Sequence, residues 1–383
     1  MHDLIVVGLG AYGAAVVHHA ARLGLDVVGI DRFDPPHEFG SSHAETRVTR
    51  LAIGEGDHYV PFARRSHELW RELESTAGRQ LLFDPGGLIV APGGERVDDR
   101  WGDFVAETAE VAARAGLPFE RLSPADARDR FPRHAFRDDE VVGFEPAGGV
   151  VLSEVAIAAQ LAAARDAGAG IIVNTAVDGF AEVPGGIEVR AGDECWTAGH
   201  VVMCTGAWTP EFSDADRLRV TRQLVCWFEV DDIEAWRPNE VAFTIWAGET
   251  IEDYLGVFSI PPGGIPGLKV VGEQFADSTT PHDVDRTGSP EEVADLHERL
   301  VAPRLRGVSD RCITSSVCLY TNTPDDHFLI DTHPGHDGVT VVSACSGHGF
   351  KHSAAIGEAL ARRVAGLDHL DLEPFRRHHR PTF

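Results

Sequence analysis

The chain contains almost no lysine. Of its 34 basic residues only Lys269 and Lys351 are lysine, and all the others are arginine. Coding bias would explain this scarcity and would give the two remaining positions no special meaning. Alternatively, both positions need a compact ammonium group with a tunable pKa, which a guanidinium group cannot supply. The two lysines are therefore candidate functional residues, with both explanations open.

Net positive charge and long apolar runs are also missing. The formal net charge is −26 and the isoelectric point is about 5.0, which argues against a nucleic acid or an anionic membrane as partner. No run of 18 apolar residues occurs, so no membrane-spanning helix is predicted. The N-terminus has no basic leader before its apolar residues, so a secretory signal peptide is not expected.

The few cysteines do not suggest a metal site. The chain has six of them, scattered without the spacing that is typical of metal ligands. We expect reduced thiols, a cytoplasmic location and no bound metal. The length of 383 residues exceeds one average domain, and 43% of the residues are hydrophobic, so two domains with well-filled cores are predicted.

The N-terminus carries a nucleotide-binding pattern. The succession consists of an apolar strand (4–7), the glycines Gly8, Gly10 and Gly13, a helix (14–23), a second apolar strand (26–30) and Asp31. The spacing of the glycines alone is weak evidence, but the whole succession is typical of a Rossmann-type dinucleotide-binding unit. A glycine-rich turn without a ligand is the alternative.

Each residue type in this pattern has a chemical reason. Gly8 permits the tight turn, Gly10 lets the backbone approach a pyrophosphate, and Gly13 lets the helix pack close to the strand. The free N–H groups at the start of the helix then face the phosphates. Asp31 can accept both hydroxyls of an adenosine ribose and disfavours a 2′-phosphate, so FAD or NAD is expected rather than NADP.

The rest of the sequence predicts a second strand–helix–strand unit that returns to the first domain. It also contains several single residues that are candidates for a functional role. Residues 32–50 read as a loop in which Arg47 and Arg50 would share a face if it were helical; a solvated basic turn is the alternative. Further predicted elements are helices at 60–74, 98–115, 154–167 and 289–305, and strands at 170–173, from 176, at 222–230, at 269–275, at 313–321 and at 339–345. A cysteine in a strand, such as Cys318, is more often a buried small hydrophobe than a reactive thiol, and a histidine between glycines, such as His348, is more often a loop residue than a catalyst.

The sequence resembles monomeric sarcosine oxidase and N-methyltryptophan oxidase, within the D-amino-acid-oxidase-like flavoproteins. The resemblance covers nearly the whole chain. It is carried by the glycine turn with Asp31, the stretches 33–37, 46–47, 54–56, 59–61 and 206–208, Cys318-Leu319-Tyr320-Thr321, and Ser346-Gly347-His348-Gly349-Phe350-Lys351. The last two stretches together are highly specific.

The resemblance implies residue roles. It implies FAD attached through a thioether to Cys318, a substrate carboxylate held by Arg50 and Lys351, and Lys269 activating oxygen beside flavin N5. Arg47 would lie against the isoalloxazine, and Lys269, Arg47 and His348 would form the catalytic set. The residues implied to bind the cofactor are Gly8, Gly10, Gly13, Asp31, Arg32, Ser41, Ser42, His43, Thr46, Arg47, Val177, Gly206, Trp208, Cys318, Gly347, His348, Gly349 and Lys351. The residues implied to contact the substrate are Arg50, Lys351, Tyr320, Leu255 and Glu273.

Three positions depart from the family pattern. Glu273 stands where family members have a histidine, Leu255 where an aromatic residue is expected, and Ile53 replaces a tyrosine. All three would fall in the substrate cavity. They put sarcosine itself in doubt and favour a larger or cyclic secondary amino acid, such as an N-methyl, pipecolate-like or proline-like compound.

We therefore expect an α/β protein with a Rossmann-like FAD-binding domain and a mostly antiparallel α+β substrate domain. The expected boundaries are 1–85, 148–221 and 316–383 for the FAD domain, and 86–147 and 222–315 for the substrate domain. The expected function is oxidation of a secondary amino acid to an imine, with O2 reduced to H2O2, by a monomer. A dehydrogenase of the same fold, a non-catalytic flavin protein and an NAD-dependent enzyme are the alternatives.

Overall fold

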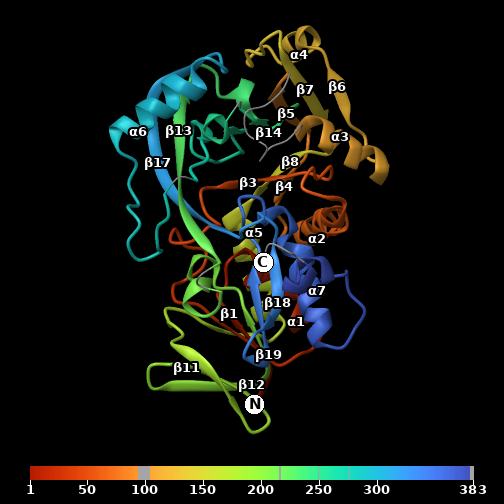
Figure 1. The fold of residues 1–383 in the computed structure, drawn as a ribbon, viewed down its shortest axis with the longest axis vertical. Coiled ribbons are helices and arrows are strands. Elements are labelled where there is room, and N and C mark those ends of the chain that lie inside the picture. The colour runs from red at the N-terminus through yellow and green to blue at the C-terminus, as the bar shows by residue number, and fades with distance from the viewer. Residues whose placement is uncertain (94–103, 215–216, 249, 276, 380–383) are drawn as a thin grey trace.

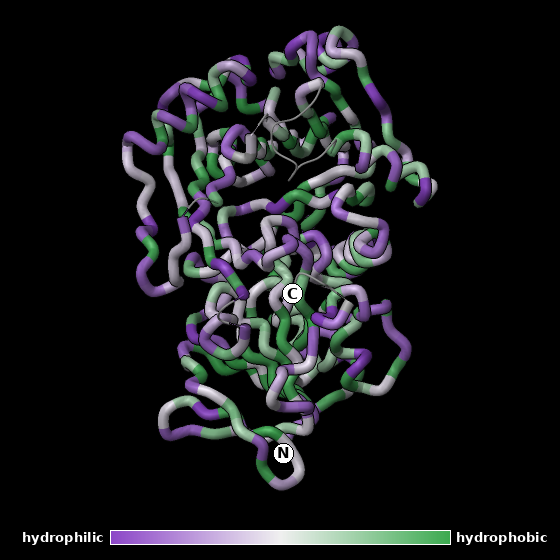
Figure 2. Tube along the Cα trace, viewed as in Figure 1, coloured by the Kyte–Doolittle hydropathy of each residue, from purple (hydrophilic) through white to green (hydrophobic). Residues whose placement is uncertain are grey.

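A computed structural model describes residues 1–93, 104–214, 217–248, 250–275 and 277–379. The molecule is elongated, with one large β-sheet at each end of its long axis and a small sheet between them (Figure 1). Hydrophobic segments gather inside both halves, whereas hydrophilic segments predominate at the periphery (Figure 2). Within the described residues, no helix combines the length and the apolar character needed to cross a bilayer.

The first sheet contains the nucleotide-binding pattern. Its members are β10 (Gly179–Val183), β11 (Gly186–Ala191), β12 (Glu194–Met203), β1 (His2–Val7), β2 (Val27–Ile30), β9 (Gly170–Ile172), β18 (Leu329–His333) and β19 (His336–Ser343). The strands β19, β12, β1, β2 and β9 run parallel in that order, and β10 with β11 forms a hairpin on β12. The predicted parallel strand at the N-terminus is thus central in this sheet.

Both faces of the first sheet are buried. Leu4 and Val6 of β1 pack in one hydrophobic cluster with four helices, whereas Ile5 and Val7 pack in another with Val189 of the hairpin. The helices are α1 (Ala11–Arg22), α2 (Val60–Ala77), α5 (Ser153–Asp166) and α7 (Ser353–Val364). The apolar run of β1 is continuous because alternate side chains serve opposite faces.

The second sheet is almost entirely antiparallel. Its order is β17 (Val308–Asn322), β13 (Arg219–Val230), β16 (Leu268–Val271), β15 (Leu255–Phe258), β14 (Phe243–Trp246), β5 (Gly87–Pro92), β7 (Glu140–Glu145) and β6 (Glu120–Leu122). Only β14 and β5 pair in parallel. The described helices of this half are α3 (Phe104–Ala115), α4 (Pro124–Arg130) and α6 (Pro290–Asp295), which continues as a π-helical turn at Leu296–Val301. The predicted α/β fold with a mostly antiparallel second sheet is confirmed.

The small sheet corrects the prediction of a loop at residues 32–50. β3 (Thr46–Thr49) pairs antiparallel with β8 (Gly149–Leu152), which also pairs with β4 (Leu82–Phe83). Arg47 lies on this strand, so the helical face imagined for Arg47 and Arg50 does not exist. The strand forms because a partner about a hundred residues away satisfies its backbone groups, which local sequence does not reveal.

Other expectations differ at their edges. The strand expected from 176 begins only at Gly179, so Val177 precedes β10. Two expected domain boundaries, after 221 and after 315, fall inside β13 and β17, which cross between the two halves as single long strands. Residues 98–103 of the helix expected at 98–115 lie outside the described residues.

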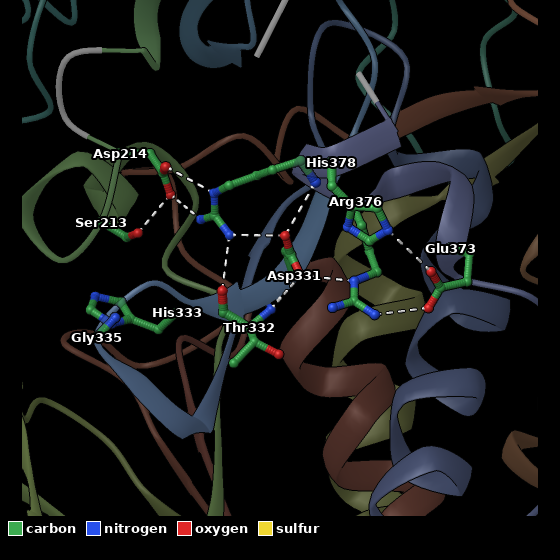
Figure 3. A network of polar contacts seen from close by, with 10 residues as sticks. Ser213, Asp214, Asp331, Thr332, His333, Gly335, Glu373, Arg376 and His378 are labelled. Atoms are coloured by element: carbon green, nitrogen blue, oxygen red, sulfur yellow. Dashed lines mark hydrogen bonds and ion pairs between the residues drawn. The ribbon is translucent and has the colours of Figure 1, made fainter. Parts of the chain in front are cut away.

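A charged network fastens the C-terminal segment to the first sheet (Figure 3). Asp331 of β18 accepts hydrogen bonds from the Arg376 Nε atom and the Arg377 backbone N–H, both at 3.1 Å. Arg377 also reaches Asp214, which follows the turn after β12. This network closes the end of the first sheet with residues from three distant parts of the chain.

Candidate active site

The glycine turn admits only glycine at two points. A Cβ atom added to Gly8, whose φ is +87°, would lie 2.4 Å from the backbone oxygen of Cys204. A Cβ added to Gly13 would lie 1.7 Å from the oxygen of Gly8. The first turn of α1 therefore sits directly on the end of β1, with its N-terminus open toward a cavity. This arrangement fits the predicted role in holding a pyrophosphate.

Asp31 closes β2 as expected. Its buried carboxylate accepts the Leu9 N–H at 2.6 Å through Oδ2 and the Phe33 N–H at 2.8 Å through Oδ1. These bonds fix the carboxylate at the cavity wall, where it retains lone pairs for ribose hydroxyls. Trp208 lines the same end, and among the described residues its buried Nε1 atom has no hydrogen-bond partner.

A single cavity of about 500 Å³ runs from this turn to the second sheet. Most predicted site residues line it. These are Gly8, Gly10, Asp31, Arg32, Ser41, Ser42, Arg47, Arg50, Val177, Gly206, Trp208, Lys269, Glu273, Cys318, Tyr320, Gly347, His348, Gly349 and Lys351. Five predicted residues are not part of the lining, namely Gly13, His43, Thr46, Leu255 and Ile53, and Ile53 is instead fully buried in the hydrophobic core around α1 and α2. The fold thus collects residues from both halves around one volume.

Cys318 on β17 lies in an electropositive setting. Arg47 donates to its Sγ atom at 3.4 Å and to the Ser41 backbone oxygen at 2.7 Å. Burial would raise the pKa of the Cys318 thiol, but Arg47, His43 and Lys269 lower it to about 6. The thiolate, which is the nucleophilic form, therefore predominates at neutral pH. His43 contributes from behind the cavity wall.

Lys269 of β16 is also held close to Arg47. Its Nζ atom donates to the backbone oxygens of Ala44 at 2.8 Å and Thr46 at 2.6 Å, and lies 4.1 Å from the centre of the Phe258 ring. Burial and the neighbouring Arg47 hold the pKa of Lys269 well below its ordinary value. Thr46 thus acts on this lysine from outside the cavity lining.

Two buried cations share one carboxylate at the other side of the cavity. Arg50 donates to Oε2 of Glu55 at 2.5 Å, and Lys351 donates to Oε1 at 3.3 Å. Burial opposes the ionisation of Glu55, but these two cations hold its pKa well below the ordinary value. Burial lowers the pKa of Lys351 to about 8, although Glu55 opposes this shift. The two cations therefore meet at a single carboxylate group, that of Glu55.

His348 completes this corner. Its Nε2 atom lies 3.0 Å from the backbone oxygen of Asp326, which can only accept, so Nε2 carries the proton. Its Nδ1 atom lies 3.7 Å from Oε1 of Glu55. Burial and the charge of Lys351 lower the pKa of His348 to about 3, so the ring is neutral at physiological pH.

The side chain of Leu255 corrects one prediction. It is fully buried in the core of the second sheet with Val257, whereas the preceding Tyr254 lines the cavity. Neighbouring residues at a strand edge point to opposite faces, so a one-residue error in alignment exchanges core and cavity. Tyr320 and Glu273 do line the cavity, with the Tyr320 hydroxyl 3.5 Å from Oε1 of Glu273.

Sequence reasoning gave no role to Glu55, Tyr254, Glu45 or Tyr12. Tyr12 donates to the Gly349 backbone oxygen at 2.7 Å and so joins the two glycine-rich turns. Glu55 lies within the stretch 54–56 on which the resemblance partly rests, and an acid between two glycines was the available signal. The roles of the other three depend on contacts between distant segments and leave no local signal.

Comparisons with known proteins agree with this geometry. The family described as FAD dependent oxidoreductase matches residues 3–363. Monomeric sarcosine oxidase of Bacillus sp. (strain B-0618) is 34% identical over 367 residues, covering 94% of this chain and 91% of that protein. N-methyl-L-tryptophan oxidase of Yersinia pestis (strain Pestoides F) is 32% identical over 362 residues, covering 94% of each chain.

Solved structures support the fold. NikD, an amino acid oxidase essential for nikkomycin biosynthesis, superimposes with a TM-score of 0.83 at 21% identity, covering 98% of this chain and 97% of that one. L-proline dehydrogenase from P. horikoshii gives a TM-score of 0.76 at 19% identity, covering 99% and 98%. The resemblance read from the sequence is confirmed, and the chain belongs to the DAO family of FAD-dependent oxidoreductases, together with monomeric sarcosine oxidase and N-methyl-L-tryptophan oxidase.

Proposed function

We propose that this oxidoreductase is an oxidase of a secondary amino acid that produces an imine and hydrogen peroxide. The observation that carries the proposal is the pair of buried cations, Arg50 and Lys351, in the same cavity as Cys318 and Lys269. Two cations around one carboxylate suit the carboxylate of an amino acid. Both lysines of this lysine-poor chain are used in the cavity, which favours function over coding bias as their explanation.

The residues present suit FAD. The turn at Gly8 and Gly10 would hold the pyrophosphate at the start of α1, and Asp31 would hold the adenosine ribose. We propose that Cys318 attaches the flavin as a thioether, supported by its lowered pKa beside Arg47 and His43. When bound, FAD supplies hydride acceptance at N5 and return of the electrons to oxygen.

The substrate carboxylate would displace Glu55 from its two partners. Arg50 and Lys351 then orient the substrate so that the carbon next to its nitrogen faces the flavin. The amine must be neutral to lose hydride, and Glu273 with Tyr320 offers polar groups inside the lining. Tyr254 and Phe258 also line the cavity, which favours a cyclic amino acid or a larger N-methylated amino acid over sarcosine.

A dehydrogenase that passes electrons to a quinone or carrier is the second candidate. The observation in its favour is that burial and Arg47 lower the pKa of Lys269, because a neutral amine would not stabilise superoxide. We favour the oxidase because Lys269 donates to two backbone carbonyls, which stabilises the ammonium form.

We further propose a cytoplasmic monomer. The proposed FAD domain comprises 1–85, 148–221 and 316–383, and the proposed substrate domain 86–147 and 222–315, each with one large sheet as its core. The scattered thiols, all unpaired with one another as disulfides, suit a reducing compartment.

Peroxide and oxygen measurements test the proposal. Sarcosine, longer N-methyl amino acids, pipecolate and proline are each supplied to the flavin-loaded enzyme, and H2O2 formation is followed together with flavin bleaching. Peroxide at the rate of substrate oxidation supports the oxidase. Bleaching followed by reoxidation over minutes in air supports the dehydrogenase, and no bleaching by any substrate contradicts both.

A further inference from the structure

We propose that Glu45 is the positioning residue for Lys269. Its carboxylate accepts hydrogen bonds from Trp227 and Ile265. Its backbone conformation directs the carbonyl groups of Ala44 and Thr46 toward the Lys269 ammonium. Only the consequence for oxygen depends on the proposed function, since the geometry concerns residues of this chain.

The backbone before β3 has an uncommon conformation. Ala44 and Glu45 have φ values of 72° and 67°, in the left-handed region that non-glycine residues rarely adopt. Two such residues in succession require support from their surroundings. The result is that the backbone oxygens of Ala44 and Thr46 both accept from Nζ of Lys269, at 2.8 and 2.6 Å.

Four hydrogen bonds hold Glu45 in this conformation. Its N–H donates to Oε1 of Glu154 at 3.0 Å, and its backbone oxygen accepts from the Ser153 N–H at 2.9 Å. Its carboxylate accepts the indole N–H of Trp227 at 2.8 Å through Oε2 and the N–H of Ile265 at 2.7 Å through Oε1. Backbone and side chain are therefore fixed from different elements, α5 on one side and the second sheet on the other.

The elements that hold Glu45 also carry Lys269. Trp227 of β13 is the residue directly opposite Lys269 of β16 in the antiparallel register, and Ile265 lies just before that strand. The contacts thus close a ring: the strands position the carboxylate of Glu45, and the backbone of residues 44–46 positions the end of the Lys269 side chain. Loss of the Glu45 carboxylate opens this ring on the side of Trp227 and Ile265.

Glu45 also contributes charge. The titratable and charged groups that act on Lys269 are Arg47 of β3, Cys318 of β17, Glu154 of α5 and Glu45 itself. Burial and Arg47 lower the pKa of Lys269, whereas a Cys318 thiolate and the two carboxylates oppose this shift. Without the charge of Glu45 the ammonium would lose its proton at a lower pH.

The scarcity of lysine makes a direct test possible. Enzyme labelled with 13C at lysine Cε gives two lysine signals, which Lys351→Met assigns. In the parent and in Glu45→Gln, the pH titration of both signals is followed by NMR. We expect the midpoint of Lys269 to fall by about one pH unit in Glu45→Gln while that of Lys351 stays. Glu292→Gln is the matched control, since Glu292 pairs with Arg222 outside the cavity lining and should change neither midpoint.

Trp227→Phe is the second variant, in case Glu45→Gln does not fold. This substitution removes the indole N–H that donates to Glu45, but it keeps an aromatic side chain at position 227 and leaves the carboxylate of Glu45 in place. We expect the pH midpoint of the Lys269 signal to change and that of the Lys351 signal to stay the same. The inference would be overturned if the pH midpoint of the Lys269 signal were unchanged in both variants. If only Trp227→Phe folds, an unchanged midpoint in that variant alone would overturn it.

The consequence for oxygen is measured separately. In the flavin-loaded enzyme, we expect Glu45→Gln to slow reoxidation of the reduced flavin about tenfold, and the loss of rate with rising pH to begin at lower pH. Anaerobic reduction by substrate should change less than reoxidation. If parent reoxidation is slow and indifferent to Lys269→Met, the proposed oxidase function fails, while the lysine titration still decides the role of Glu45.

Discussion

At the scale of single residues, the cavity balances two buried cations with one carboxylate. Glu55 neutralises part of the positive charge of Arg50 and Lys351, because a buried cation without an anionic partner would strongly destabilise the folded protein. In the proposed function, the carboxylate of the substrate replaces that of Glu55 as the partner of both cations. Binding therefore depends on the ionisation of Lys351, whose pKa burial lowers to about 8.

We predict that binding of an unreactive substrate-like carboxylate weakens as the pH rises through about 8, where Lys351 loses its proton. The sign follows because only the ammonium form attracts the ligand. Lys351→Met should raise the Kd by about 10- to 100-fold at pH 7, as expected for a lost charged hydrogen bond. Lys351→Arg, which stays charged, should abolish the inflection near pH 8. Titration by flavin absorbance measures each Kd; an inflection that persists in Lys351→Arg would contradict the assignment.

Covalent attachment of the flavin is the second prediction at this scale. After denaturation in acid, the yellow colour should stay with the parent protein and be released from Cys318→Ala. The matched control is Cys345→Ala, because Cys345 lines the same cavity but burial raises the pKa of its thiol. This control should keep the colour on the protein. Release from the parent itself would show that no thioether forms.

At the scale of elements, the turn between β1 and α1 separates packing from ligand binding. Gly13 touches the Gly8 backbone, so its role is within the protein, whereas an added Cβ at Gly10 would meet nothing closer than the Ser42 Oγ atom at 3.6 Å. The two glycines serve the same motif through different contacts.

We therefore predict different outcomes for the two alanine substitutions. Gly13→Ala should displace α1 from β1 and lower the stability by roughly 2–4 kcal/mol, because the added carbon overlaps backbone. Gly10→Ala should leave the melting temperature of the flavin-free protein within about 2 °C and weaken FAD binding at least tenfold. Thermal unfolding and flavin titration measure both, and equal loss of stability in the two variants would contradict this division.

β3 is a strand that the local sequence does not predict, because it forms only by pairing with the distant β8. It is four residues long, and its pattern of threonine, arginine and valine is indistinguishable from that of a polar loop. Its pairing with β8 brings Arg47 beside Cys318 and places Thr46 over Lys269. The long, strongly periodic elements, such as α2 and the strand–turn–helix unit at the N-terminus, were predicted nearly to their ends.

At the scale of the whole molecule, the network around Asp331 joins segments that are distant in the sequence. Asp331 and Asp214 accept hydrogen bonds from Arg376 and Arg377, which fasten the C-terminal segment (Figure 3). Burial would raise the pKa of each carboxyl group, but these arginines lower both pKa values below the ordinary 3.8. Ionised carboxylates therefore stabilise the folded state above that pH.

We predict that Asp331→Asn lowers the free energy of unfolding by about 1–2 kcal/mol between pH 5 and 8. Since the folded-state pKa of Asp331 is depressed, its contribution is complete above about 4 and is lost as the pH falls through the folded value. The difference between parent and variant should therefore shrink below pH 4. Urea unfolding at several pH values measures this difference. The control is Asp138→Asn, because Asp138 is exposed in its ion pair with Arg128 and its loss should change the free energy of unfolding little.

The sequence by itself determined the cofactor-binding unit, the α/β class and most of the residues around the cavity. The glycine spacing and the apolar periodicity have local chemical meaning and indicated the nucleotide-binding unit, whereas most of the cavity residues followed from the resemblance to the sarcosine oxidase family. The tertiary structure decided that Leu255 belongs to the core and Tyr254 to the cavity, that β3 is a strand, and that Glu55 and Glu45 serve the two lysines. These outcomes depend on which distant backbone and charge come within a few ångströms, and no single stretch of chain encodes that distance.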